Sequence, residues 1–346
     1  MKKATLIFLM ICLSGILHAQ DFNYHIRLSH FFDNREYENR YAIPQTLFGI
    51  KISPELEWKK KDENGAEHSI HFGVHYLQLI GASLKKGQFN PIAFYQYKSG
   101  GYNLHFGVVP YGLLIEKLPL HTMSDSLYYM YQNINGALIQ YKSNKGFFEG
   151  MLDWRGVMSS QTREAFRVIL KGRYYVGDFS LGGITFLNHL ANKAPTQPKE
   201  GVCDDYLVSP EIGYHLDKNK ILDTTSIRLG YIFAYTRERI TNRSFTSNGV
   251  ILDLFVKWHF MAIQNSLYVG KNIMPLYEKY GSVLHLGDPF YRASRYNRTS
   301  LMLYLIDKEF VTCTFEWNLH FTKGDPIGHQ QLLNLRIKLD QLTFKH

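Results

Sequence analysis

The chain has 346 residues, and its 39 basic and 30 acidic residues give it a formal net charge of +9. Aromatic residues make up 15% of the chain, with 24 Tyr and 23 Phe, and no Pro-, Gly- or Ser-rich tract divides it into separate domains. Beyond the N-terminus, charged or strongly polar residues interrupt every apolar stretch before it reaches the ~18 residues of a membrane-spanning helix. These features exclude a helical membrane protein and a chain built of linked domains.

Segment 1–20 has the layout of a secretory signal. Lys2 and Lys3 precede an apolar run from Leu6 to Leu13, and Ala19 stands at the small-residue position of a cleavage site. The apolar run is shorter than the ~20 residues of a spanning helix, which argues against a membrane anchor. We therefore expect a cleavable signal peptide over 1–20 and one mature domain over 21–346. Export also argues against nucleic acid as the partner of this basic chain.

Apolar and polar residues alternate along the mature chain with a period of two. Between Glu309 and Phe321, for example, every second residue is apolar and the residues between them are polar. Successive side chains of a strand point to opposite faces, so such segments are strands with one apolar and one polar face. The predicted strands are 22–31, 47–58, 66–79, 90–98, 102–112, 133–142, 146–155, 164–175, 179–188, 205–216, 225–236, 248–259, 264–271, 297–306, 309–321 and 330–342.

Short and long connections alternate between these strands. Tight turns such as Ser99-Gly100-Gly101 and Asp307-Lys308 are separated by long loops. A soluble β-sandwich has the same residue alternation, but this pattern of connections is typical of transmembrane barrels. We therefore predict an all-β, antiparallel, up-and-down transmembrane barrel of about 16 strands, or 14 if one hairpin is absent. Its short turns and both termini would be periplasmic, and its long loops extracellular.

This architecture resembles that of the bacterial outer-membrane porins and porin-like barrels. The resemblance implies a location in the outer membrane of a Gram-negative bacterium. It also implies that loop 113–132 folds inward as a constriction loop, whose candidate residues are Ser124, Asp125, Tyr128 and Tyr129. The alternative is an outer lid or a partner-binding loop. The chain departs from the pattern at its C-terminus, where a bulge near Asp340 and Gln341 is needed to keep the apolar residues in phase.

Charged residues occupy the predicted polar face, which would line the pore. The pore-lining candidates are Arg155, Arg167, Lys171, Arg173, Glu149, Asp153, Arg228, Lys257, Asp253, Arg336 and Lys338. The basic residues of the two neighbouring strands 146–155 and 164–175 are the most concentrated set, which suggests an anion-binding wall. Alternatively, Glu149 and Asp153 neutralise this set and the interior is closed by salt bridges.

Linear signatures of catalysis do not occur in the sequence. It contains no Gly-x-Ser-x-Gly elbow, His-Glu-x-x-His motif or phosphate loop. His71 and His75 lie four residues apart on one predicted strand, about 13 Å, so they cannot share a metal ion. We therefore predict no catalytic residues, no metal, no cofactor and no enzymatic activity. A catalytic set on the outer barrel wall, which needs no linear motif, remains the alternative.

The sequence thus favours a porin-like channel for small hydrophilic solutes, with a preference for anions. A non-catalytic accessory subunit of a larger outer-membrane assembly, secretion or nutrient-uptake complex is the alternative. The expected partners are outer-membrane lipid and lipopolysaccharide, further copies of the chain in a homotrimer, and other outer-membrane proteins. Loops 189–204 and 272–296 are the predicted docking surfaces. The second loop is rich in aromatic residues such as Tyr277, Phe290 and Tyr291, which are common at protein interfaces.

Overall fold

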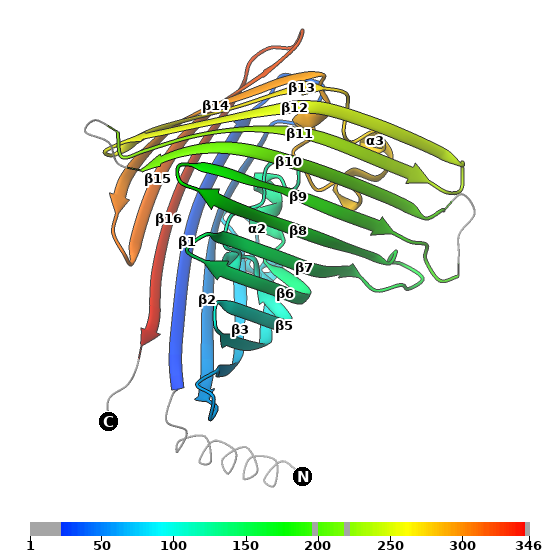
Figure 1. Ribbon diagram of the computed structural model, residues 1–346. Helices are drawn as coiled ribbons and strands as arrows, with labels where there is room; N and C mark the ends of the chain where they lie inside the picture. The colour runs from blue at the N-terminus through cyan, green and yellow to red at the C-terminus, as the bar shows by residue number, and fades with distance from the viewer. Residues whose placement is uncertain (1–21, 196–199, 218–221, 343–346) are drawn as a thin grey trace.

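The computed structural model describes residues 22–195, 200–217 and 222–342, and the predicted signal peptide lies outside them. Within these residues, sixteen strands form one closed antiparallel barrel in which β1 pairs with β16 (Figure 1). The strands are β1 (Phe22–Glu36), β2 (Gln45–Lys61), β3 (Glu67–Leu79), β4 (Gln88–Ser99), β5 (Tyr102–Pro110), β6 (Asn133–Ser143), β7 (Gly146–Gly156), β8 (Ala165–Val176), β9 (Phe179–Leu190), β10 (Cys203–Asp217), β11 (Thr224–Glu238), β12 (Arg243–Trp258), β13 (Met261–Gly270), β14 (Arg295–Asp307), β15 (Val311–Thr322) and β16 (Gly328–Leu342).

The predicted fold class is confirmed, with sixteen strands and not fourteen. The predicted bulge is also confirmed. Tyr24 pairs with Leu342 while Ile26 pairs with Leu339, so β16 contains one extra residue at this point. Closure removes every free sheet edge, which satisfies the backbone hydrogen bonds of all strands.

The helical segments are short: η1 (Leu84–Lys86), η2 (Tyr111–Leu113), α2 (Asp125–Met130), α3 (Tyr277–Tyr280), η3 (Gly281–Val283) and η4 (Pro289–Arg292). Among the described residues, no helix has the length and apolar character needed to cross a bilayer.

The two ends of the barrel differ in their connections. The turns 62–66, 100–101, 144–145, 177–178, 259–260 and 308–310 lie at the end where β1 starts and β16 stops, which we call the short-turn end. The opposite, long-loop end carries loops such as 37–44, 111–132, 191–202 and 271–294. Gly100 and Gly101 form the turn between β4 and β5 with φ of 55° and 89°, a backbone conformation that glycine adopts without steric cost.

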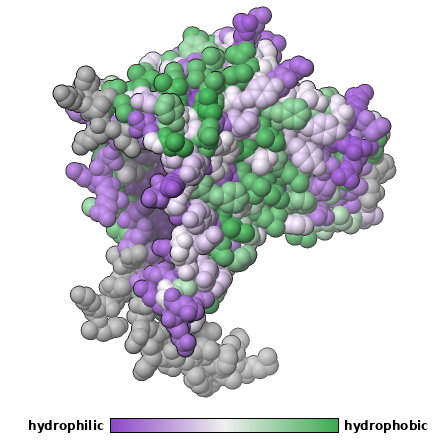
Figure 2. Space-filling view, viewed as in Figure 1, coloured by the Kyte–Doolittle hydropathy of each residue, from purple (hydrophilic) through white to green (hydrophobic). Residues whose placement is uncertain are grey.

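The outer wall is apolar. Outward-facing side chains such as Phe72, Phe106, Leu170 and Tyr231 are exposed. Figure 2 shows hydrophobic residues gathered over the wall and hydrophilic residues toward its ends. An apolar outer band of this kind suits contact with hydrocarbon, because lipid tails cannot hydrate polar side chains.

The interior of the barrel is filled by loops. Figure 1 shows α2 and α3 within the ring of strands. Met123 of loop 111–132 and Phe290 of loop 271–294 join inward-facing residues such as Val109 and Ile134 in one buried apolar cluster. A sixteen-strand barrel is too wide for its own wall side chains to fill, so inserted loops complete the packing.

This packing corrects the predicted role of loop 272–296. Two of the aromatic residues on which that prediction rested, Phe290 and Tyr291, are not available for docking, because each is only 1% exposed. Burying two large aromatic side chains inside the barrel removes more apolar area from water than an exposed loop would.

Candidate active site

The predicted basic set on β7 and β8 holds loop 111–132 in place. The fully buried Arg167 donates to the Tyr111 hydroxyl oxygen at 2.5 Å, and that hydroxyl donates to Asp153 at 2.6 Å. Lys171 pairs with Glu149 at 3.0 Å and donates to the carbonyl oxygen of Glu116 at 2.5 Å. These cations are therefore neutralised by wall carboxylates and by the inserted loop.

The other two basic residues of this set behave in the same way. Arg173 pairs with Glu116 at 2.5 Å and with Glu211 at 2.6 Å. Arg155 donates to the carbonyl oxygen of Val283, at 2.9 Å, and so holds loop 271–294. The four basic side chains thus bind the loops that fill the barrel.

The remaining pore-lining candidates lie toward the short-turn end. Arg228 is the register partner of Asp253 across β11 and β12. Lys257 pairs with Asp307 at 3.0 Å. Arg336 and Lys338 are exposed on β16.

The predicted constriction residues lie inside the barrel. Asp125 begins α2 and pairs with Arg298 of β14 at 2.8 Å, so the helix reaches the far wall. Tyr129 stacks on Phe31 of β1, with ring centroids 4.3 Å apart. Tyr128 accepts a hydrogen bond from the backbone of Leu118 at 2.5 Å, and the Ser124 hydroxyl lies 3.2 Å from that of Ser126.

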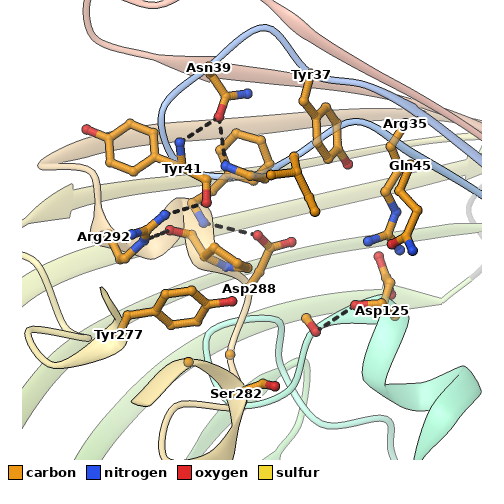
Figure 3. Close-up of a pocket in the computed structure, with 18 of the residues that line it drawn as sticks. Arg35, Tyr37, Asn39, Tyr41, Gln45, Asp125, Tyr277, Ser282, Asp288 and Arg292 are labelled. Atoms are coloured by element: carbon orange, nitrogen blue, oxygen red, sulfur yellow. Dashed lines mark hydrogen bonds between the residues drawn. The ribbon is translucent and has the colours of Figure 1, made fainter. Parts of the chain in front are cut away.

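A pocket of about 550 Å³ opens at the long-loop end between loops 37–44, 111–132 and 271–294 (Figure 3). The Arg292 guanidinium lies over the rings of Tyr41 and Tyr277, at 5.6 and 4.6 Å from their centroids. Asp288 accepts a hydrogen bond from the backbone N–H of Phe290 at 3.1 Å, and burial raises the pKa of the Asp288 carboxyl. The described lining contains no histidine, the side chain that most often acts as a base near neutral pH.

Histidine–carboxylate pairs occur elsewhere in the structure. His71 on β3 and His285 in loop 271–294 pair with Glu55 and Asp205 inside the barrel. His189 on β9 pairs with Asp204 on β10, and both residues face outward, since their neighbours Leu190 and Cys203 pack in the interior cluster beside Leu284. Of these three pairs, His189–Asp204 is the one that a molecule outside the wall can reach.

The His189–Asp204 pair has the geometry of an oriented base. Nδ1 of His189 lies 2.7 Å from Asp204 Oδ1. A carboxylate only accepts, so Nδ1 carries a proton, and in the neutral form of the ring Nε2 keeps its lone pair. Arg239 donates twice to Asp204 Oδ2, at 2.9 and 2.7 Å, which fixes the carboxylate. Within the part of the chain that the structure describes, no residue hydrogen-bonds His189 Nε2.

The His189–Asp204 pair belongs to a row of outward-facing side chains close to the long-loop end. The strand register places Trp154, Phe166, His189, Asp204 and Arg237 side by side on five neighbouring strands. Phe166 stacks on His189 with centroids 4.8 Å apart, and Trp154 stacks on Phe166 at 5.1 Å. The row therefore offers an aromatic platform, a base and an exposed guanidinium in sequence.

The sequence prediction missed this pair because one predicted strand ended a residue before His189 and the next began a residue after Asp204. The predicted strands end at 188 and begin at 205, so His189 and Asp204 were assigned to loop 189–204. In the structure β9 extends to Leu190 and β10 begins at Cys203. Extending the alternation by one step would have placed both polar residues on the outward face. The described residues contain no group of three or more His, Cys, Asp and Glu that is placed to hold a metal ion.

Several solved structures have a similar fold. OpdL of Pseudomonas aeruginosa has a TM-score of 0.56 and 9% identity, covering 92% of this chain and 99% of its own. OccK2 (OpdF) of the same organism has a TM-score of 0.56 and 8% identity, covering 94% and 99%. A loop L8 deletion mutant of OmpT of Vibrio cholerae has a TM-score of 0.55 and 9% identity, covering 93% and 100%. At these identities the likeness shows the porin-like fold alone.

Comparison with protein-family models and curated proteins gives a second result. No curated protein matches the chain. A family model described as "Lipid A 3'-O-deacylase-type" matches residues 16–345, which include all sixteen strands.

Proposed function

Because the chain belongs to the lipid A 3'-O-deacylase-type family, we propose that it is an acyl-ester hydrolase that acts on a lipid A-type glycolipid. The prediction from sequence that the chain is not an enzyme is wrong, since this is an enzyme family. The absence of a linear motif misled that prediction, because residues on separate strands can form a site without any characteristic spacing.

The nature of the substrate argues for a site on the outer wall. Lipid A anchors lipopolysaccharide in the outer leaflet, with its acyl esters just below the phosphorylated sugars. We infer that the barrel lies in the outer membrane with its long-loop end outside. An ester in that leaflet then meets the wall near the outer ends of the strands. His189 is the penultimate residue of β9 at that end, beside the aromatic pair Trp154 and Phe166. Aromatic girdles mark this depth in outer-membrane barrels.

The wall-facing His189–Asp204 pair is the observation that carries the proposal. His189 Nε2 takes a proton from a water molecule, whose oxygen attacks the acyl carbonyl carbon. Asp204 accepts the Nδ1 hydrogen bond and stabilises the imidazolium that forms. His189 then returns the proton to the sugar oxygen as the ester C–O bond breaks. The products are a free fatty acid and a sugar hydroxyl.

The two neighbouring arginines, Arg239 and Arg237, have different roles. Arg239 is committed to Asp204 through two hydrogen bonds and positions it. Arg237 is exposed beside the pair, and its guanidinium is suited to a sugar phosphate, which it can bind through two parallel hydrogen bonds.

A channel for small hydrophilic solutes is the second candidate function. The sixteen-strand porin-like fold favours it, since barrels of this size commonly enclose a water-filled lumen. The apolar cluster that loops 111–132 and 271–294 form in the interior opposes free passage. Conduction would therefore require movement of these loops, which single-channel recording would detect.

The test of the hydrolase is mass spectrometry of lipid A incubated with the purified, folded barrel. We expect the wild type to release one ester-linked acyl chain and His189→Ala to release none. The matched control is His30→Ala. His30 also faces outward in the long-loop half, but it packs edge-on against Phe48 and has no carboxylate partner among the described residues. The proposal fails if folded wild type leaves lipid A intact or if His189→Ala retains its activity.

A further inference from the structure

The pocket at the long-loop end is a cavity that the proposed hydrolase does not use. Its volume of about 550 Å³ lies in the range of about 300–1,000 Å³ that is usual for small-molecule sites. Loops 37–44, 111–132 and 271–294 line it, whereas His189 faces outward from the barrel wall. In the proposed orientation of the barrel, a ligand enters this pocket from outside the cell.

The formal charges of the lining cancel. Three arginines and three acidic residues line the pocket, and each of the arginines is already paired with a carboxylate. The three pairs are Arg35 with Asp33, Arg40 with Asp325, and Arg292 with Glu278. An anionic ligand would have to compete with these carboxylates for the guanidinium groups, so the pocket is not suited to a negative charge.

The lining does not suit a positive charge either. Asp125 and Glu278 are each paired with an arginine. Asp288 has no ion-pair partner among the described residues, but Arg35 and Arg298 lie near enough to act on its charge. These guanidinium groups repel an ammonium group or a metal ion that approaches Asp288. The pocket is therefore suited to an uncharged ligand.

Several polar groups of the lining are free to bind such a ligand. Tyr41, Tyr277, Ser282 and Gln45 line the pocket, and their side-chain polar groups have no hydrogen-bond partner among the described residues (Figure 3). Asp288 is 9% exposed, and its carboxyl accepts only one backbone N–H, which leaves its second oxygen available. Together these side chains offer hydroxyl, amide and carboxyl groups to a ligand that has many hydroxyls of its own.

Two aromatic rings supply the apolar part of the lining. Tyr41 and Tyr277 are half-buried, and the Arg292 guanidinium packs on both rings. Arg292 also donates to the backbone carbonyl oxygens of Tyr41 and Pro289, which holds the two loops together. A ring that is fixed in this way can stack against the C–H face of a sugar, while hydroxyls around the edge of the sugar bind the polar groups.

We propose that this pocket binds an uncharged saccharide, which enters from the long-loop end. The C–H face of one sugar ring lies against Tyr277. Asp288 accepts hydrogen bonds from sugar hydroxyls, and Ser282 and Gln45 bind further hydroxyls. The site breaks no bond and is separate from the His189 site. A saccharide of this chemistry can be a free oligosaccharide or the sugar chain of lipopolysaccharide.

The first experiment is saturation-transfer difference NMR on the folded barrel in a sugar-free detergent. The uncharged probes are maltotriose, cellotriose and triacetylchitotriose. We expect at least one of them to bind and to show saturation of its ring C–H protons, which lie closest to the aromatic rings. The glucosamine trimer, which has the chitotriose backbone with positive charges, and the anionic trigalacturonate should bind about tenfold more weakly, because unpaired charges are costly to bury. Binding of no uncharged probe, or equal binding of charged and uncharged trimers, would overturn the proposal.

Variants then locate the site. Tyr277→Ala removes the stacking ring and should weaken binding of the uncharged probe about tenfold, whereas Tyr277→Phe keeps the ring and should lose less. Gln45→Ala should also weaken binding. Gln161→Ala is its matched control, since Gln161 is exposed at the same end of the barrel but does not line the pocket. Heat-modifiable gel mobility should verify that each variant is folded. Wild-type binding by folded Tyr277→Ala and Gln45→Ala would refute the site.

A last titration uses an uncharged O-polysaccharide released from lipopolysaccharide by mild acid. Tighter binding of this chain than of any trisaccharide supports the site with lipopolysaccharide as the source, and the reverse supports it with free saccharide as the source. None of these probes carries an ester-linked acyl chain. Failure of the saccharide site would therefore leave the His189 hydrolase standing, and loss of lipid A hydrolysis would leave the saccharide site standing.

Discussion

Asp204 and Asp205 are adjacent in the sequence, yet each pairs with a histidine on a different side of the barrel wall. Asp204 lies 2.7 Å from His189 on the outer face, and Asp205 lies 3.2 Å from His285 inside the barrel. Successive side chains of a strand point to opposite faces, so one dipeptide serves both histidines. The outer pair is open to lipid, whereas the inner pair anchors loop 271–294.

This relationship allows a matched test of the outer pair. Asp204→Asn removes the charge that holds the proton on Nδ1 of His189, and the hydrolysis rate should fall roughly 10²–10⁴-fold, the range expected for loss of general-base catalysis. The measurement is the initial rate of acyl release from lipid A. Asp205→Asn is the control, which should loosen loop 271–294 but preserve hydrolysis. A similar loss of rate in both variants would show that the site depends on the loop and not on the outer pair.

The ion pair between Asp125 and Arg298 should keep the barrel interior closed. Both side chains are largely buried, and removing one partner of such a pair costs about 3–5 kcal/mol, since the other charge is left uncompensated. We expect Asp125→Asn to release α2 and to produce open-channel events in planar bilayers that are rare in wild type. Lys117→Met is the control. Lys117 also contacts Asp125, but its side chain is 58% exposed, so its loss should matter little. A folded Asp125→Asn barrel as silent as wild type would contradict this role.

The Tyr111 hydroxyl should contribute to the stability of the inserted loop. It joins Asp153 to the buried Arg167, and Tyr111→Phe leaves both groups short of one partner. The expected cost is about 1–3 kcal/mol, seen as a lower midpoint of heat-induced unfolding on gels. Tyr231→Phe on the outer wall should change that midpoint little, because the Tyr231 ring is exposed and its hydroxyl has no hydrogen-bond partner among the described residues. Equal midpoints for the two variants would argue against the Tyr111 contribution.

Asp288 should make loop 271–294 less stable as pH rises. Burial raises the pKa of its carboxyl, so the folded protein favours the protonated form. The resulting contribution to stability is complete below the ordinary pKa of about 3.9 and is lost as pH rises through the raised value. Asp288→Asn keeps an oxygen for the N–H of Phe290 and carries no charge. We expect this variant to protect the loop from hydrogen exchange at pH 7 more than wild type does, with little difference at pH 3.

The exposed Glu278 provides the control for this pH dependence. Its side chain is 85% exposed and lies in the same loop. Glu278→Gln should leave the pH dependence of loop exchange as it is in wild type. A loop whose exchange responds to pH equally in wild type and Asp288→Asn would exclude Asp288 as its source.

The strands could be predicted closely, but the candidate site could not. Alternation with a period of two identified all sixteen strands, and the phase of Leu339 and Leu342 located the bulge in β16. At strand ends the signal is weaker, because a polar residue there fits a loop as well as an outward strand position. His189 and Asp204 occupy such ends. Their pairing also depends on the register between β9 and β10, which the local sequence does not encode.

The sequence by itself determined the closed barrel. Its period of two and its alternating short and long connections follow from the pleat of each strand and from the solvent on each face, and both are local properties. Only the tertiary structure decided which loops fill the barrel and which histidines meet carboxylates. Those outcomes depend on residues far apart in the chain, such as Asp125 and Arg298, whose contact exists only once the wall has closed around the loops.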